Sequence, residues 1–200
     1  MTARIVVLAS GNGSNLQAIL DASRDRTLDA RVVALMSNNA DAYAHTRAAA
    51  ADVPSITIAR IANETREQYD TRLADCVAEF APDFIVLAGW MRLLSMAFLA
   101  RYPHQVINLH PALPGEFPGT HAIEHALEAH QRLGLERTGV MVHFVPDEGV
   151  DDGPVIATIE VPIELNESLA SLEARVHAAE HALLVDALRQ LIGSPAPPEP

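Results

Sequence analysis

The sequence of 200 residues contains a single cysteine, Cys76. One cysteine excludes an intramolecular disulfide and is typical of a protein from a reducing compartment. Cys76 lies in an amphipathic segment with no neighbouring feature that would make its thiol reactive. We therefore expect it to pack against the core and not to act as a nucleophile.

Basic residues are also scarce, since 14 lysines and arginines face 26 acidic residues and the formal net charge is -12. Nucleic-acid binding needs a cationic surface, so we expect no nucleic-acid partner. A small anionic ligand stays compatible with this charge, because a few local N–H donors can hold a phosphate. No apolar run reaches the roughly 18 residues of a membrane span, and residues 1–4 begin no secretory signal. We expect a cytoplasmic protein with no membrane partner.

Short apolar runs alternate with helical segments through the first half of the chain. The runs occupy residues 5–9, 32–36, 56–58 and 84–88, and helices are expected after residue 14, over 42–51 and over 65–80. Strands that are apolar on both faces, with helices between them, indicate an α/β fold with a doubly wound, mostly parallel, Rossmann-like sheet. Thr65 and Gln68 are placed to form a capping box, and Ser14 or Asn15 to cap the first helix.

The second half of the chain follows a different pattern. A strand is expected over 106–110, a proline- and glycine-rich loop over 111–119, a helix over 122–129, antiparallel strands over 138–145 and 154–161, and a long helix over 169–191. We expect residues 1–193 to form one domain, because no linker or internal repeat divides them. The proline-rich residues 194–200 are expected to be a disordered tail.

Residues 11–16, Gly-Asn-Gly-Ser-Asn-Leu, stand between the first strand and the first helix. Glycines let the backbone approach a ligand closely, and N–H groups at a helix start bind anions. The segment is neither a Walker loop nor a complete dinucleotide fingerprint, because Leu16 stands where a third glycine belongs. A phosphate site and a simple tight turn both remain open on these residues alone.

Asn108 and His110 are two residues apart on an expected strand, so their side chains point to the same face. An amide donor and an imidazole aimed at one point can stabilise an oxyanion and move a proton during attack on a carbonyl. Asp151, in the acidic loop 147–154, would orient the ring and favour its charged form. The alternative is a histidine bonded within a strand end and an acidic surface turn.

Two further patterns could be either functional sites or ordinary parts of the fold. Residues 121–125 and 177–181 both read His-x-x-Glu-His, the spacing of some zinc proteases, but neither has an evident third ligand. We interpret both as solvent-facing helix surface and expect no metal. Trp90 and Arg92 follow a strand end, where a parallel sheet binds its ligands. They could receive a ring system and a carboxylate, or Trp90 could pack in the core.

Five segments taken together resemble the glycinamide ribonucleotide formyltransferases. They are residues 10–16, 87–92, 107–111, 142–145 with 151–154, and 174–181. Their order and spacing extend over almost the whole chain. The set is specific, although the Asn-x-His and Asp pattern is shared by all 10-formyltetrahydrofolate hydrolases and transferases of this fold. The resemblance implies the formyltransferase fold and formyl transfer to the amine of 5'-phosphoribosylglycinamide, with 10-formyltetrahydrofolate as co-substrate.

The resemblance also implies a role for each matching residue. The catalytic residues would be Asn108, His110 and Asp151, and no metal is implied. Substrate phosphate would lie on Gly13, Ser14 and Asn15, and the ribose hydroxyls on Glu180. The folate pocket would be formed by Arg66, Met91, Arg92, Leu93, Leu94 and Asn108. A homodimer is left open.

The chain departs from the family pattern after His110, where many relatives read Pro-Ser-Leu-Leu-Pro and this sequence reads Pro-Ala-Leu-Pro-Gly. Contacts of residues 111–119 therefore cannot be carried over. Asp151 is preferred to Asp152 because it stands two residues before Gly153-Pro154. The rival functions are formyltetrahydrofolate deformylase, which normally has an extra N-terminal domain, and a non-catalytic folate- or nucleotide-binding module. Methionyl-tRNA formyltransferase is disfavoured by its extra C-terminal domain and by the acidic charge here.

Overall fold

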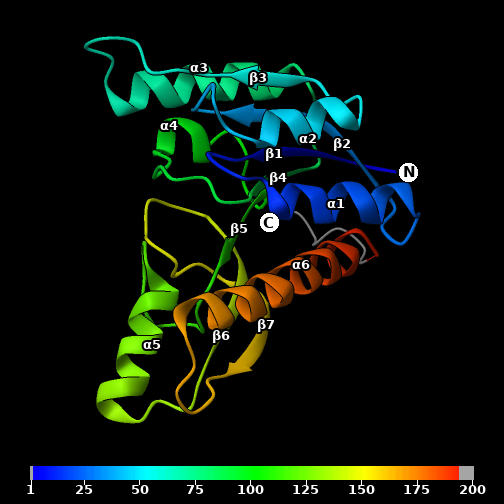
Figure 1. Cartoon of the computed structure of the whole chain (residues 1–200). Helices are drawn as coiled ribbons and strands as arrows, with labels where there is room; N and C mark the ends of the chain where they lie inside the picture. The colour runs from blue at the N-terminus through cyan, green and yellow to red at the C-terminus, as the bar shows by residue number, and fades with distance from the viewer. Residues whose placement is uncertain (1, 194–200) are drawn as a thin grey trace.

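The computed structural model describes residues 2–193, so the predicted tail 194–200 lies outside the described residues. Across the described residues, seven strands form one sheet in the order β3-β2-β1-β4-β5-β6-β7 (Figure 1). The strands are β1 Ala3–Leu8, β2 Ala30–Ser37, β3 Ser55–Thr57, β4 Phe84–Leu87, β5 Val106–His110, β6 Arg137–Phe144 and β7 Val155–Pro162. The first five are parallel, and β6 and β7 are antiparallel. The predicted doubly wound α/β sheet with antiparallel strands at one end is confirmed.

Helices cover both faces of this sheet (Figure 1). They are α1 Ser14–Arg24, α2 Ala44–Ala50, α3 Arg66–Ala78, α4 Met96–Leu99, α5 Ala122–Leu133 and α6 Leu169–Gly193. Buried residues of α1, α2, α5 and α6 share one apolar cluster, and those of α3 and α4 share another. No helix within residues 2–193 has the length and apolar character needed to cross a membrane.

The first strand shows why its apolar run is continuous. Ile5 and Val7 belong to the cluster under α1 and α6, whereas Val6 and Leu8 belong to the cluster under α3. All four side chains are fully buried. Because successive side chains of a strand point to opposite faces, a strand covered on both sides must be apolar at every position.

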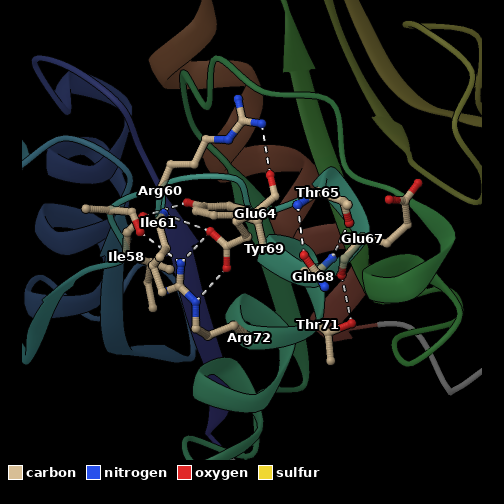
Figure 2. Close-up of polar contacts among 11 residues, drawn as sticks. Ile58, Arg60, Ile61, Glu64, Thr65, Glu67, Gln68, Tyr69, Thr71 and Arg72 are labelled. Carbon is tan, nitrogen blue, oxygen red and sulfur yellow. Dashed lines mark hydrogen bonds and ion pairs between the residues drawn. The ribbon is translucent and has the colours of Figure 1, made fainter.

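The predicted capping box of α3 is present. The Thr65 hydroxyl accepts from the Gln68 N–H at 3.2 Å, and the Gln68 side chain accepts from the Thr65 N–H at 3.0 Å (Figure 2). The cap expected for α1 is wrong. Gly13, with φ +74°, is the N-cap residue of α1, and no side chain caps this helix. Glycine takes this position because a left-handed conformation is unfavourable for residues with a Cβ.

Two helix assignments also differ from the prediction. Helix α5 continues to Leu133, beyond the expected end at residue 129, and ends at Gly134 in the left-handed conformation. Helix α4 was not expected at all, because its four residues are too few for a helical period to show in the sequence.

The ends of β1, β4 and β5 lie at the same edge of the sheet, where parallel α/β proteins bind their ligands. Residues that follow β1 and β4 are joined directly. The Ser10 N–H donates to Gly89 O at 3.0 Å, and the Met91 N–H donates to Ser10 Oγ at 2.9 Å. The antiparallel register then places His143 of β6 opposite Asn108 of β5. The topology thus brings the candidate segments to one edge.

Candidate active site

Asn108, His110 and Asp151 lie together at the end of β5. The Asn108 amide donates to Asp151 Oδ1 at 2.9 Å, and His110 Nδ1 lies 3.3 Å from Asp151 Oδ2. Asp151 reaches this position from the loop between β6 and β7 with a left-handed backbone, φ +54°. Its neighbour Asp152 is exposed. The structure therefore groups Asp151, and not Asp152, with the amide and the imidazole.

His110 is almost fully buried, and each of its ring nitrogens faces an oxygen acceptor. Nε2 lies 3.0 Å from Phe117 O, and Nδ1 faces the Asp151 carboxylate. A neutral imidazole has only one N–H, whereas the imidazolium has two. The surroundings of His110 therefore suit the ring that carries a proton on both nitrogens.

The carboxyl group of Asp151 is held in its charged form. Burial opposes ionisation of this group, but its contact with His143, the hydrogen bond from the Gly119 N–H and charge on His110 lower its pKa below the ordinary value. The Gly119 N–H donates to Asp151 Oδ2 at 2.8 Å. A negative charge beside His110 is thus maintained near neutral pH.

His143 completes this cluster and was missed as a site residue by the sequence analysis. Its Nε2 lies 3.1 Å from Asn108 Nδ2 and 3.6 Å from Asp151 Oδ1, and its Nδ1 lies 2.8 Å from Phe144 O. His143 is buried. The sequence pattern predicts pairing of β6 with β7 only, and it therefore indicates no contact between His143 and Asn108. A histidine that follows the apolar residues 140–142 of this strand is the available signal.

The amide nitrogen of Asn108 is already engaged on both sides. It lies within hydrogen-bonding distance of Asp151 Oδ1 and of His143 Nε2. An amide nitrogen carries two hydrogens, and protein groups already occupy both of its sides. A substrate oxygen that binds to this amide must therefore replace one of the two contacts.

The residues expected around the phosphate and ribose form a second group. The Asn15 amide donates to Glu180 Oε2 at 3.2 Å, which joins the start of α1 to α6. His177 Nδ1 lies 2.9 Å from the same oxygen. Gly13 and Ser14 precede Asn15 at the N-terminal end of α1. The structure thus brings the predicted phosphate segment to the predicted ribose residue.

Gly13 has two physical reasons to be glycine. Its φ is +74°, and a Cβ at this position would lie 2.8 Å from Ala44 Cβ. Arg47 holds the preceding residue, since its Nε and Nη2 donate to Asn12 O and Oδ1, both at 2.9 Å. Helix α2 therefore fixes residues 12 and 13 and holds their backbone close to Ala44.

The residues expected around the folate are placed in three different ways. Met91 is 69% exposed and Leu93 52% exposed, whereas Leu94 is buried in the α3 core. The Arg92 guanidinium lies over the ring of Tyr69. Arg66, at the start of α3, forms an ion pair with Glu148 of the acidic loop. Arg66 thus contacts the loop that carries Asp151, whereas Met91 and Leu93 expose apolar side chains on the segment that follows β4.

A cavity of about 370 Å³ opens beside Asp151. Its lining comes from Pro114, Gly115, Glu116, Pro118, Met141, Val150, Asp151, Asp152, Gly153 and Val155. Another cavity, of about 840 Å³, lies between α5 and the outer strands and touches none of the predicted site residues. The smaller cavity is the one at the candidate site.

The two His-x-x-Glu-His segments lie in different surroundings. His121 is the N-cap residue of α5, with φ +62°, and its Nδ1 lies 2.9 Å from Glu124. The expectation of solvent-facing surface is wrong for Glu180, which is buried. Over residues 2–193, no three histidine, cysteine or acidic side chains are grouped so that they could hold a metal ion.

Comparison with known proteins extends the match over the whole fold. Residues 3–188 match the family model described as formyl transferase. The chain is 44% identical to phosphoribosylglycinamide formyltransferase of Schizosaccharomyces pombe, over 96% of this chain and 98% of the relative. It is 45% identical to the Escherichia coli protein of the same name, over 90% of this chain and 82% of the relative.

Solved structures give the same result. Glycinamide ribonucleotide transformylase 1 from Geobacillus kaustophilus aligns with a TM-score of 0.90 and 39% identity, over 96% of this chain and all of the other. The corresponding protein from Symbiobacterium toebii has a TM-score of 0.89 and 38% identity, over 94% of this chain and 86% of the other. Sequence and fold therefore match the same group of proteins.

Proposed function

The chain belongs to the phosphoribosylglycinamide formyltransferases of the formyl transferase family, and we propose that it formylates 5'-phosphoribosylglycinamide in purine biosynthesis. The formyl donor is 10-formyltetrahydrofolate. The observation that carries the proposal is the contact of Asp151 with both Asn108 and His110 at the end of β5. A buried imidazole, an amide and a carboxylate at one point are what formyl transfer requires.

Gly13, Ser14 and Asn15 hold the substrate phosphate at the N-terminal end of α1. The backbone N–H groups of a first helical turn have no partner within the helix and favour an anion. Glu180 accepts hydrogen bonds from the ribose hydroxyls, because an ionised carboxylate has acceptor oxygens and no donor. Its present contacts to Asn15 and His177 then change as the nucleotide binds.

The folate lies against the segment that follows β4. The exposed side chains of Met91 and Leu93 offer an apolar surface to its ring system, and Leu94 supports them from the core. Arg92 lies in this segment. Arg66 receives a carboxylate of the glutamate tail in exchange for Glu148, its present partner. This pair is exposed enough that the exchange costs little free energy.

Formyl transfer proceeds by attack of the substrate amine on the formyl carbon. A bond forms between that nitrogen and the carbon, and the carbonyl oxygen becomes an oxyanion. The positive charge of the His110 imidazolium stabilises this oxyanion across a short distance, and one N–H of Asn108 donates to it in place of one of its two present contacts. The bond from carbon to the folate N10 then breaks, and N10 takes up a proton in place of the one that the amine loses. No covalent enzyme intermediate is needed.

Asp151 keeps the second proton on His110 and fixes the orientation of its ring. Its carboxylate faces Nδ1, whereas Phe117 O fixes Nε2. The lowered pKa of Asp151 keeps this negative charge in place. The carboxylate also helps to pass the proton from the attacking amine to the folate nitrogen through water.

Residues 1–193 act as one formyltransferase domain, with phosphate binding near the start of the chain and the catalytic residues in the C-terminal half. The reaction takes place in the cytoplasm, in keeping with a single free cysteine. A homodimer is compatible with this function but is not required by it.

Steady-state kinetics test the proposal. Deformylated folate should form from 10-formyltetrahydrofolate only when 5'-phosphoribosylglycinamide is present. His110→Ala should lower turnover by at least about two orders of magnitude, the usual size of general acid and oxyanion effects. Turnover without the nucleotide would instead identify a deformylase. Ligand binding without turnover in either mixture would identify a binding module.

A further inference from the structure

The folate-binding segment between β4 and α4 contains no regular secondary structure. Residues 88–95 nevertheless place Met91 and Leu93 outward and Leu94 inward. At its start, this segment is held by the hydrogen bond from the Met91 N–H to Ser10 Oγ. Side chains of α3 hold the rest of it.

The first of these side chains is Tyr69. The guanidinium carbon of Arg92 lies 4.5 Å from the centroid of the Tyr69 ring, within the range of a cation–π contact. Tyr69 is fully buried, and its hydroxyl donates to Ile58 O at 2.8 Å. Among residues 2–193, the buried Arg92 Nε has no hydrogen-bond partner, and the guanidinium is oriented by its contact with the Tyr69 ring.

Tyr69 is itself fixed by the network shown in Figure 2. The guanidinium carbon of Arg72 lies 5.4 Å from the centroid of the same ring. Both oxygens of Glu64 accept from Arg72, at 3.0 and 2.9 Å, and one of them also accepts from the Ile61 N–H at 3.0 Å. The hydrogen bond from Arg72, followed by that from Ile61, lowers the pKa of Glu64. The Glu64 carboxylate therefore stays charged and continues to hold Arg72 against the Tyr69 ring.

The second side chain is Asp70, the next residue of α3. Its Oδ2 accepts from the Ser95 N–H at 2.6 Å, and Asp70 and Ser95 are both buried. This charged hydrogen bond fixes the end of the segment just before α4 begins. Two adjacent buried residues of one helix thus contact the same irregular segment at two points.

We propose that Tyr69 and Asp70 are positioning residues for the folate, because they fix the arginine and the backbone of the segment on which the folate binds. This inference rests on the proposed function and adds two residues that never touch the substrates. Burial, as the largest cause, raises the pKa of Tyr69 to about 12, against the opposing effect of the arginines. The ring therefore stays neutral and keeps its cation–π contact at every pH at which the enzyme is assayed.

Three substitutions and one control test the proposal. Tyr69→Phe keeps the ring and should change the folate KM by less than about twofold. Tyr69→Leu removes the ring and should raise it about tenfold, the size of a partly buried cation–π contact. Asp70→Asn, which keeps the shape of the side chain and one acceptor oxygen, should raise it about threefold, because a neutral amide oxygen accepts a weaker hydrogen bond than a carboxylate does. Thr71→Val, on the exposed face of α3, should change nothing.

The KM for the nucleotide should stay within about twofold in every variant, because the phosphate and ribose residues do not contact Tyr69 or Asp70. An unchanged folate KM in the folded Asp70→Asn variant would overturn the inference for Asp70. Equal changes in both KM values would reduce the two residues to a general structural role. Should Tyr69→Leu not fold, the weaker replacement Tyr69→Met provides the same comparison with Tyr69→Phe.

Calorimetric titration with 10-formyltetrahydrofolate in the absence of nucleotide separates this inference from the proposed function. The dissociation constant should rise in Tyr69→Leu and Asp70→Asn by the same factors as the KM. If the wild-type chain binds this folate but does not transfer its formyl group, the proposed function fails while the positioning role stands. If the variants bind the folate as tightly as the wild type does, the positioning role fails whatever the turnover.

Discussion

Replacement of Asp151 by asparagine removes one charge from the site and almost no volume. Asp151 accepts from the Asn108 amide at 2.9 Å and from the Gly119 N–H at 2.8 Å, and it faces His110 Nδ1 at 3.3 Å. Three donors thus surround one carboxylate. An amide has a single acceptor oxygen, so its NH₂ group must turn toward at least one of these donors.

The size of the effect on catalysis follows from that geometry. Opposite unit charges at the distance of the His110–Asp151 pair attract by about 5 kcal/mol at an effective dielectric constant of about 20. Part of this attraction is offset by the hydrogen bond that the asparagine can still accept. If about 3 to 4 kcal/mol is lost from the transition state, kcat falls by about 10² to 10³-fold.

The assay is the nucleotide-dependent formation of deformylated folate, with Asp152→Asn as the matched control. Asp152 is adjacent and carries the same charge but is exposed, so its variant should retain wild-type turnover. KM values for both substrates should change little in Asp151→Asn, because the lost interaction acts in the transition state. Full activity in Asp151→Asn, or an equal loss in Asp152→Asn, would refute the assignment of the catalytic carboxylate.

The stability of the wild-type protein and that of Asp151→Asn should depend differently on pH. The lowered pKa of Asp151 means that its stabilising contribution is present above the unfolded value of about 3.9 and is lost as the pH falls through the folded value. The difference in unfolding free energy between wild type and Asp151→Asn should therefore shrink as the pH falls below about 4. Urea unfolding at several pH values measures it, and a constant difference would contradict the charge-based explanation.

Other parts of the fold give three further predictions. Gly13→Ala should lower the free energy of unfolding by about 1 to 3 kcal/mol, measured in urea, and should raise the nucleotide KM. The reason is that the new Cβ would lie 2.8 Å from Ala44 Cβ, on a residue with a left-handed φ. An unchanged stability and KM would contradict this close packing. Thr65→Ala should cost about 1 kcal/mol through loss of the α3 cap, seen as a lower thermal midpoint without loss of turnover. The hydrogen bond to Glu180 raises the pKa of His177. The contribution of this pair to the stability of the fold is therefore complete below about pH 6.5, the ordinary histidine pKa, and is lost as the pH rises through the pKa of His177 in the folded protein. NMR titration should show a lower His177 pKa in Glu180→Gln.

Much of the fold could be predicted because local patterns and global topology agree. The continuous apolar run of β1 requires cover on both faces, and the structure provides it with two separate clusters. Thr65 and Gln68 form the predicted capping box because capping depends only on residues three apart. The predicted cap of α1 failed because Gly13 takes a left-handed conformation under close packing with Ala44, a contact that a local pattern does not contain.

The contacts of the site were less predictable, because they depend on strand register and loop conformation. His143 faces Asn108 only through the antiparallel pairing of β6 with β5, which the sequence analysis did not specify. The sequence assigns no role to the loop 111–119, which departs from the family pattern. It supplies Phe117 O to His110 and the Gly119 N–H to Asp151. Backbone atoms make both contacts, so residue identity alone carries little information about them.

The fate of the formyl carbon tests the central claim most directly. The purified chain is incubated with 5'-phosphoribosylglycinamide and with 10-formyltetrahydrofolate that carries carbon-13 in its formyl group, and the products are identified by NMR spectroscopy. Our account predicts that the label appears in the formylated glycinamide of the nucleotide, with His110→Ala slower by at least about 100-fold. Label released as formate, or retained in the folate, would contradict it.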